Sequence, residues 1–205
     1  MPKIDFKKQF KELFSASKTK VQVVDVPTMN FFMVDGKGDP NNSQSFQEAM
    51  ESLYGMAYTL KFMLKGNESF DDFVVPPLEG LWWTDDMGRF SMDNKKEWNW
   101  TVMNMQPEFV TGEMVDESRA QLEKKKNPVA LSKLRFEKLS EGKCVQIMHI
   151  GPYDTEAPTI SKMHQFIALN GFHPDGKHHE IYLSDPRRTA PEKQKTILRQ
   201  PIRLA

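Results

Sequence analysis

Apolar residues along this chain follow two different spacings, and the alternation between them predicts a mixed α+β fold. Helical spacing is clearest over residues 45–65, where one apolar stripe consists of Phe46, Met50, Leu53, Ala57, Leu60 and Leu64. Ser45 and Glu48 fit a capping box at the start of this helix. Weaker helical patterns cover residues 111–126 and 156–168. These three segments are therefore expected to form helices of ordinary length.

Strand patterns rich in β-branched and aromatic residues lie between these helices. They cover residues 21–26, 30–34, 81–84, 98–103, 134–139, 143–150, 178–183 and the region around 197–198. The order strand, Gly/Pro turn, helix, strand, strand occurs twice, over about 21–107 and 134–205, with the helix at 111–126 as the connection. Such a repeat predicts an internal duplication around a pseudo-twofold axis. A cleft between the two halves is then the expected ligand site.

The first 20 residues are charged throughout and contain no continuous apolar segment. Neither a signal peptide nor a membrane span is therefore expected there. Phe6, Phe10, Leu13 and Phe14 recur at helical spacing, so residues 1–20 are predicted to form one amphipathic helix that docks on the single domain formed by residues 21–205.

Composition narrows the class of protein. The 205 residues suffice for a substantial core without cross-links. The chain contains 28 basic residues (Lys plus Arg) and 28 acidic residues (Asp plus Glu). This balance of charge argues against nucleic acid or an anionic membrane as the main partner. The only cysteine, Cys144, lies in an apolar strand pattern and is interpreted as a buried, inert thiol. A reduced, cytoplasmic protein is expected.

One acid and four tryptophans stand out as candidates for a binding site. Glu180 interrupts an apolar strand, where burying a carboxylate is costly without a partner or a purpose. Alternation places Glu180 and Tyr182 on one face of that strand. The tryptophans are Trp82, Trp83, Trp98 and Trp100, on two segments that read as neighbouring strands. Ordinary core packing and a ligand-binding wall both remain open for them, as does an ion pair with Lys or Arg for Glu180.

Superposing the two repeats refines the tryptophan assignment. Tyr182 then corresponds to Trp82, so Trp82 is predicted to face the cleft and Trp83 the helices. Trp98 and Trp100 share one face of their strand, but the pattern does not identify which one.

Other chemistries have little support in the sequence. His178 and His179 point to opposite faces and have no further His or Cys at ligand spacing, so no metal site is expected. No GxSxG, phosphate-loop or Cys/His nucleophile pattern occurs, and no cofactor is expected. His149 and Tyr153 flank the Gly151-Pro152 turn at the mouth of the expected cleft. Tyr153 can offer a ring and a hydroxyl there, while His149 reads equally well as a satisfied strand residue.

Four features together resemble the GyrI-like small-molecule-binding family over residues 21–204. They are HIGPYD (149–154), HEIYLSDPRR (179–188), EGLWW (79–83) and the repeated order of elements. The resemblance implies duplicated SHS2-type modules with an antiparallel sheet curved around a central cleft and helices on the outer face. It also implies that Glu180 is the cleft glutamate that attracts cationic aromatic drugs in regulators of this family. No helix-turn-helix precedes the module, so direct DNA binding is not expected.

EGLWW and WNW are similar to a stand-alone, tryptophan-rich subfamily that hydrolyses the cyclopropane of DNA-alkylating cyclopropanoids. This resemblance implies a detoxifying hydrolase. The chemistry of ring opening by water then suits Glu180 as the group that activates the water, and either Tyr153 or Tyr182 as the donor to the developing oxyanion. The ligand would be held by Trp82, Trp98, Trp100, Tyr182, Trp83 and His149. Two alternatives stay open at this point: a drug-sequestering protein without catalysis, and a gyrase-inhibitor-like interaction protein.

Overall fold

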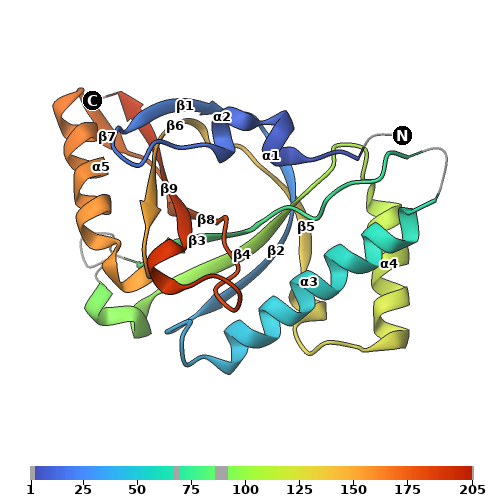
Figure 1. Ribbon diagram of the computed structural model, residues 1–205. Helices are drawn as coiled ribbons and strands as arrows, with labels where there is room; N and C mark the ends of the chain where they lie inside the picture. The colour runs from blue at the N-terminus through green and yellow to red at the C-terminus, as the bar shows by residue number, and fades with distance from the viewer. Residues whose placement is uncertain (1–2, 67–69, 86–91, 205) are drawn as a thin grey trace.

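A computed structural model describes residues 3–66, 70–85 and 92–204 of the chain (Figure 1). The helices are α1 (Phe6–Gln9), α2 (Lys11–Phe14), α3 (Gln44–Leu64), α4 (Gly112–Lys125) and α5 (Ala157–Leu169). The strands are β1 (Gln22–Val26), β2 (Met29–Lys37), β3 (Leu78–Trp83), β4 (Asn99–Gln106), β5 (Arg135–Leu139), β6 (Gly142–Ile150), β7 (Phe172–Pro174), β8 (His178–Tyr182) and β9 (Lys195–Leu204). Short 3-10 segments within the described residues include η2 (Met92–Glu97), η3 (Leu131–Lys133), η4 (Tyr153–Thr155) and η5 (Pro191–Lys193). Within the described ranges, no helix combines the length and the apolar character needed to cross a membrane.

The strands form a 9-stranded antiparallel sheet in the order β1-β6-β9-β8-β3-β4-β2-β5, with β7 beside β9. The strand order divides into two groups of three neighbouring strands. One group consists of β2-β4-β3 and the other of β6-β9-β8, and the groups meet where β3 pairs with β8. Each outer strand pairs with the group that is more distant in sequence: β1 pairs with β6, and β5 pairs with β2. The α+β class is confirmed.

Helices α3 and α5 lie on the same face of the sheet. Cross-strand partners point to one side of a sheet, and the register Val34, Val102, Gly80, Glu180, Leu198, Ile147 crosses it from β2 to β6. Val34 and Val102 pack with the buried stripe of α3, and Leu198 and Ile147 pack with α5. The apolar stripe predicted for α3 is confirmed at Leu53, Ala57, Leu60 and Leu64, although Ser43 rather than Ser45 caps the helix.

The N-terminal segment covers the opposite face (Figure 1). The prediction of one helix over residues 1–20 is wrong, because two short helices meet at Phe10, whose backbone leaves the helical region. Asp5 caps α1 by accepting a hydrogen bond from the Lys7 amide. Phe6 and Phe14 are buried against the sheet together with Leu13. The chain changes direction at the break, and all three apolar side chains pack in the same cluster against the sheet.

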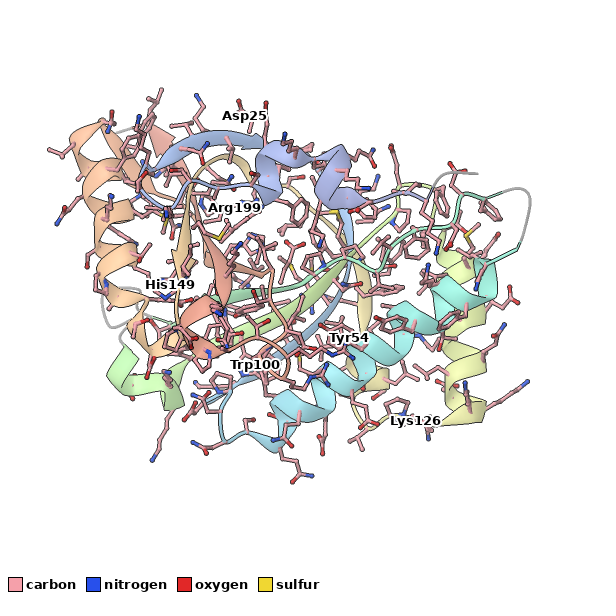
Figure 2. The ribbon with its side chains drawn as sticks, in the orientation of Figure 1. Asp25, Tyr54, Trp100, Lys126, His149 and Arg199 are labelled. Carbon is pink, nitrogen blue, oxygen red and sulfur yellow. The ribbon has the colours of Figure 1, made fainter. Side chains whose placement is uncertain are left out.

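A buried charged network joins this face of the sheet to the N-terminal segment. His179 on β8 lies 3.0 Å from Glu141 through Nδ1 and 3.0 Å from Glu79 through Nε2. Arg199 on β9 lies 3.5 Å from Glu141, and its guanidinium donates to the Leu13 carbonyl and to Gln146. Figure 2 shows Arg199 on the side of the sheet that faces α1 and α2. The network thus ties the α2 backbone to the centre of the sheet.

The charge of His179 makes fold stability depend on pH. Burial by itself lowers the pKa of His179, but the charge of Glu141 and the hydrogen bonds from Glu141 and Glu79 outweigh it and raise the pKa to about 9. A raised pKa in the folded state stabilises the fold below the unfolded value of about 6.5, and this contribution is lost as the pH rises through about 9. Urea unfolding at about pH 6 and about pH 9.5 should differ by on the order of 3 kcal/mol. Equal stability at both values would contradict this assignment.

Candidate functional site

A cavity of about 1190 Å³ opens between α3, the sheet and the chain around Val74–Leu78. Phe46, Met50 and Tyr54 line it from α3, and Figure 2 shows Tyr54 on this helix. Trp82 and Glu180 line it from β3 and β8. The resemblance had implied helices on the outer face, away from the ligand. In the structure α3 instead forms a wall of the cavity, because the sheet face that carries Glu180 is also the face on which α3 packs.

Glu180 lies at the inner end of this cavity, and two neighbours hold its carboxylate. Tyr182 donates a hydrogen bond of 2.6 Å from its hydroxyl to Oε2. The Nε2 atom of His178 lies 3.4 Å from Oε1. All three side chains share one face of β8, as alternation along a strand requires. Only 8% of Glu180 is exposed, so its charge is largely withdrawn from water.

A second carboxyl group, which the sequence analysis did not identify, lies beside Glu180. Glu156 precedes the first turn of α5 and is 1% exposed. Burial and, after it, the charge of Glu180 raise the pKa of Glu156 to about 10. Glu156 is therefore a neutral carboxylic acid near pH 7. The inner end of the cavity thus brings two carboxyl groups together, and the proximity of Glu180 disfavours ionisation of Glu156.

Two tyrosines complete the acidic end. Burial and the charge of Glu180 raise the pKa of Tyr182 well above its ordinary value. The ring of Tyr153 stands edge-on to that of Tyr182, with centroids 5.5 Å apart. Burial, followed by the charges of Glu156 and Glu180, raises the pKa of Tyr153 to about 12. Both hydroxyls therefore stay protonated and can act as hydrogen-bond donors.

The four tryptophans separate into three positions. Trp82 and Trp98 line the cavity, with their rings 5.5 Å apart in an edge-on arrangement. Trp100 is fully buried and contacts the Phe46 ring edge-on, with ring centroids 5.0 Å apart. Trp83 lies on the opposite sheet face, where Lys177 stands over its ring. Trp82 thus lines the cavity, as the repeat predicted. The prediction that Trp83 faces the helices and holds the ligand is not met, because α3 and α5 pack on the sheet face of Trp82 and Trp83 lies on the other face. The face that Trp98 and Trp100 share is the one that carries the cavity.

A hydrogen bond fixes Trp82 to the acidic end. Its indole Nε1 donates to the Tyr182 hydroxyl at 3.1 Å, and that hydroxyl donates to Glu180. Gly80 makes this arrangement possible, because a Cβ there would stand 2.9 Å from the Trp82 nitrogen and 3.2 Å from the Tyr182 oxygen. A glycine in the middle of a strand often marks such a close approach.

Gly80→Ala should displace the Trp82 indole and destabilise the fold by about 1–3 kcal/mol, the usual cost of forcing one carbon into a packed site. Ligand affinity should fall in parallel. Gly112→Ala is the matched control, because nothing lies within 4 Å of a Cβ at that position. Thermal unfolding and a ligand titration would measure both effects. Equal behaviour of the two variants would show that the close approach at Gly80 is unimportant.

The remaining candidates lie outside the cavity lining. His149 is buried and interacts through its ring with Thr159, Thr155 and the Pro152 carbonyl, so it organises the start of α5. Cys144 is buried on the other face, and burial raises the pKa of its thiol to about 12. Across the described part of the chain, no group of three or more His, Cys, Asp or Glu side chains is arranged to hold a metal ion.

The chain is similar to known proteins in both sequence and structure. The profile of the GyrI-like small molecule binding domain matches residues 19–203. An uncharacterized conserved protein from Listeria innocua is 45% identical, with a TM-score of 0.92 over 98% of this chain and 100% of that one. A hydrolase from Listeria innocua is 44% identical, with a TM-score of 0.89 over the same shares.

Proteins with much lower sequence identity share only the fold with this chain. The C-terminal domain of EcmrR is 12% identical and has a TM-score of 0.60, over 91% of this chain and 98% of that domain. No curated protein matches the chain. On the profile match and the full-length likeness to the Listeria innocua proteins, the chain belongs to the family of GyrI-like small molecule binding domains.

Proposed function

We propose that the protein binds flat aromatic molecules in this cavity and hydrolyses the cyclopropane ring of cyclopropanoids. The observation that carries the proposal is the pair of buried carboxyl groups, Glu180 and Glu156, at the inner end of an aromatic cavity. The name hydrolase given to a relative that is 44% identical over its full length supports catalysis. The sequence likeness of EGLWW and WNW to the tryptophan-rich subfamily supports the substrate class.

The reaction suits the groups that are present. In a cyclopropanoid the strained ring is conjugated to a dienone, so attack of water on the ring's methylene carbon breaks one ring bond. The electron pair of that bond moves through the conjugated system and ends on the former carbonyl oxygen as a phenolate. Glu180 takes the proton of the attacking water as general base. The hydroxyl group of the water ends on the methylene carbon, and its proton passes from Glu180 to the phenolate. The net reaction is therefore the addition of one water molecule.

Each neighbouring group has a distinct part in this proposal. Tyr182 is committed to Glu180 by a 2.6 Å hydrogen bond and orients its carboxylate. Tyr153, which is protonated, is the tyrosine that donates to the developing oxyanion. Glu156 stays neutral, so it adds no second negative charge beside Glu180. Trp82 and Trp98 hold the flat substrate against the acidic end.

We also propose that the chain arose by duplication of one strand-helix-strand-strand unit, and that the site lies where the two copies meet. The strand orders β2-β4-β3 and β6-β9-β8 are the same, and each unit places its helix on the cavity face. Under a pseudo-twofold relation, Trp82 and the Glu180 strand come from equivalent edge strands that pair at the centre. A site at the junction of two repeats then draws its aromatic wall from one and its acid from the other.

The direct test is opening of a cyclopropanoid, followed by chromatography with purified protein beside a buffer control. We expect turnover well above the buffer rate and saturable quenching of tryptophan fluorescence by the ring-opened product. Turnover equal to that in buffer would end the hydrolase proposal for that substrate. Saturable quenching without turnover would favour the second candidate, a sequestering protein for cationic aromatic drugs. The charge of Glu180 and the aromatic walls supply what such ligands need.

A further inference from the structure

Lys95 is a partly buried cation in the wall of the cavity. It lies in η2, where the Trp98 amide donates a hydrogen bond of 3.2 Å to the Lys95 carbonyl. A turn of this kind places side chains three positions apart on the same side. The Lys95 ammonium accordingly stands over the Trp98 ring, with Nζ 5.6 Å from the ring centroid. Trp98 packs edge-on against Trp82, so the cation lies beside the aromatic wall of the cavity.

The other cations of the cavity lining are placed differently. Two of them pair with carboxylates that also line the cavity: Lys126 with Glu51 at 2.7 Å, and Arg187 with Asp185 at 3.0 Å. A third, Lys7, is exposed and lies on α1 next to the helix cap Asp5. Among the residues that the structure describes, no carboxylate forms an ion pair with Lys95. The Lys95 ammonium can therefore bind an oxygen that a ligand brings into the cavity.

The charge of Lys95 also reaches the acidic end of the cavity. Burial and then the charge of Glu180 raise the pKa of Glu156 to about 10, while the charge of Lys95 acts in the opposite direction. Outside the cavity lining, Lys95 has a smaller part than the Asn41 amide in lowering the pKa of Asp39. The cavity thus presents carboxyl groups and an ammonium to the same ligand. Electrostatic complementarity favours a ligand that has both an electron-poor and an electron-rich edge.

We infer that Lys95 forms a subsite for an acceptor oxygen at the edge of a flat ligand that packs against Trp98 and Trp82. The ligand class is then a planar aromatic molecule with a carbonyl, phenolate or carboxylate oxygen. The inference rests on the proposed function, since it requires that the cavity bind flat aromatic molecules. An ammonium has three donors and no acceptor, so oxygen is the partner that it binds. The hydrogen bond is strongest when that oxygen is also charged.

This subsite suits the reaction proposed above. The former carbonyl oxygen gains negative charge as the cyclopropane opens. A fixed positive charge beside that oxygen is in place before the reaction begins, so it stabilises the negative charge as it develops. Like charges repel, so the same ammonium weakens the binding of cationic drugs, the ligands of the second candidate function.

The test compares three bicyclic probes of similar shape: the anion naphthoate, the neutral naphthamide and the permanent cation N-methylquinolinium. Affinities are measured by isothermal titration calorimetry at about pH 7, where a free carboxylic acid is ionised. Lys95→Met keeps an unbranched side chain over Trp98 and removes the charge. We expect this variant to lower the ratio of naphthoate affinity to naphthamide affinity about tenfold. The affinity for N-methylquinolinium should not fall, because a repelling charge has been removed.

Lys96→Met is the matched control, because Lys96 is exposed in the same 3-10 segment and lies outside the cavity lining. It should reproduce the wild-type affinities. An equal fall for all three probes in Lys95→Met would overturn the inference and show that Lys95 supports the packing of the wall. An unchanged ratio in Lys95→Met would also overturn it, while leaving the proposed ligand class in place. Failure of all three probes to bind the wild-type protein would instead overturn that ligand class, and this inference with it.

Discussion

Glu180→Gln should lower the turnover of a neutral cyclopropanoid by about 10²-fold or more, the usual contribution of a general base. The amide keeps the shape of the carboxyl group and can still accept from Tyr182, but it cannot take a proton from water. Stacking on Trp82 and Trp98 is unchanged, so the affinity for the neutral substrate should stay nearly the same. Turnover and substrate affinity, measured separately, test both parts of the expectation.

Glu192→Gln is the matched control, because Glu192 is an exposed glutamate in η5 outside the cavity lining. It should turn over substrate like wild type. An unimpaired Glu180→Gln variant would remove Glu180 from the mechanism. A parallel loss of affinity for neutral ligands and of turnover would show that Glu180 supports the shape of the cavity and does not act as base. Far-ultraviolet circular dichroism of both variants would establish that they are folded.

The second large effect is expected on stability, from Glu141→Ala. Glu141 is buried between His179 and Arg199, and although burial raises its pKa, the charge of His179 and then that of Arg199 hold the pKa below its ordinary value. Removing one partner of a buried ion network leaves the other charges unpaired and costs about 3–5 kcal/mol. Urea unfolding at neutral pH should therefore show a large fall in the free energy of unfolding.

Glu137→Ala is a suitable comparison, because Glu137 also forms an ion pair, with Arg135, but on the surface. Exposed pairs contribute about 0–1 kcal/mol, so this variant should be close to wild type. A loss below about 1 kcal/mol for Glu141→Ala would mean that water reaches the network when it is disturbed. The cavity lies on the other face of the sheet, so ligand affinity in a folded Glu141→Ala variant should change little.

Much of the fold follows from local patterns. The stripe on α3, the strands that flank it and the turn at Gly151 are all visible as periodicity or turn residues. The N-terminal segment was mispredicted because helical spacing of Phe6 and Phe14 does not reveal the break at Phe10. The exchange of β1 and β5 between the two units was also not predicted, since pairing partners of edge strands depend on contacts between distant segments.

The candidate site was recognised in part. Glu180 and Tyr182 were found because an acid in an apolar strand is conspicuous, and alternation then fixed their common face. Glu156 was missed because an acid at the start of a helix is ordinarily a solvated residue that favours the helix dipole. Its side chain makes no capping hydrogen bond, and only the packing of α5 against β6 and β9 buries it.

The sequence by itself determined the elements, the alternation along β8 and the balance of charge, because these depend on neighbours within a few residues. Tertiary structure alone decided that Glu156 is buried beside Glu180, which tryptophans line the cavity and which histidine lies next to Glu180. The pKa of Glu156 depends on burial and on a carboxylate 24 positions away in sequence, 180 against 156. His178 and His179 are adjacent in the chain, yet the pleat places one beside Glu180 at the cavity and the other in the ion network beneath α2, since successive side chains of a strand point to opposite faces.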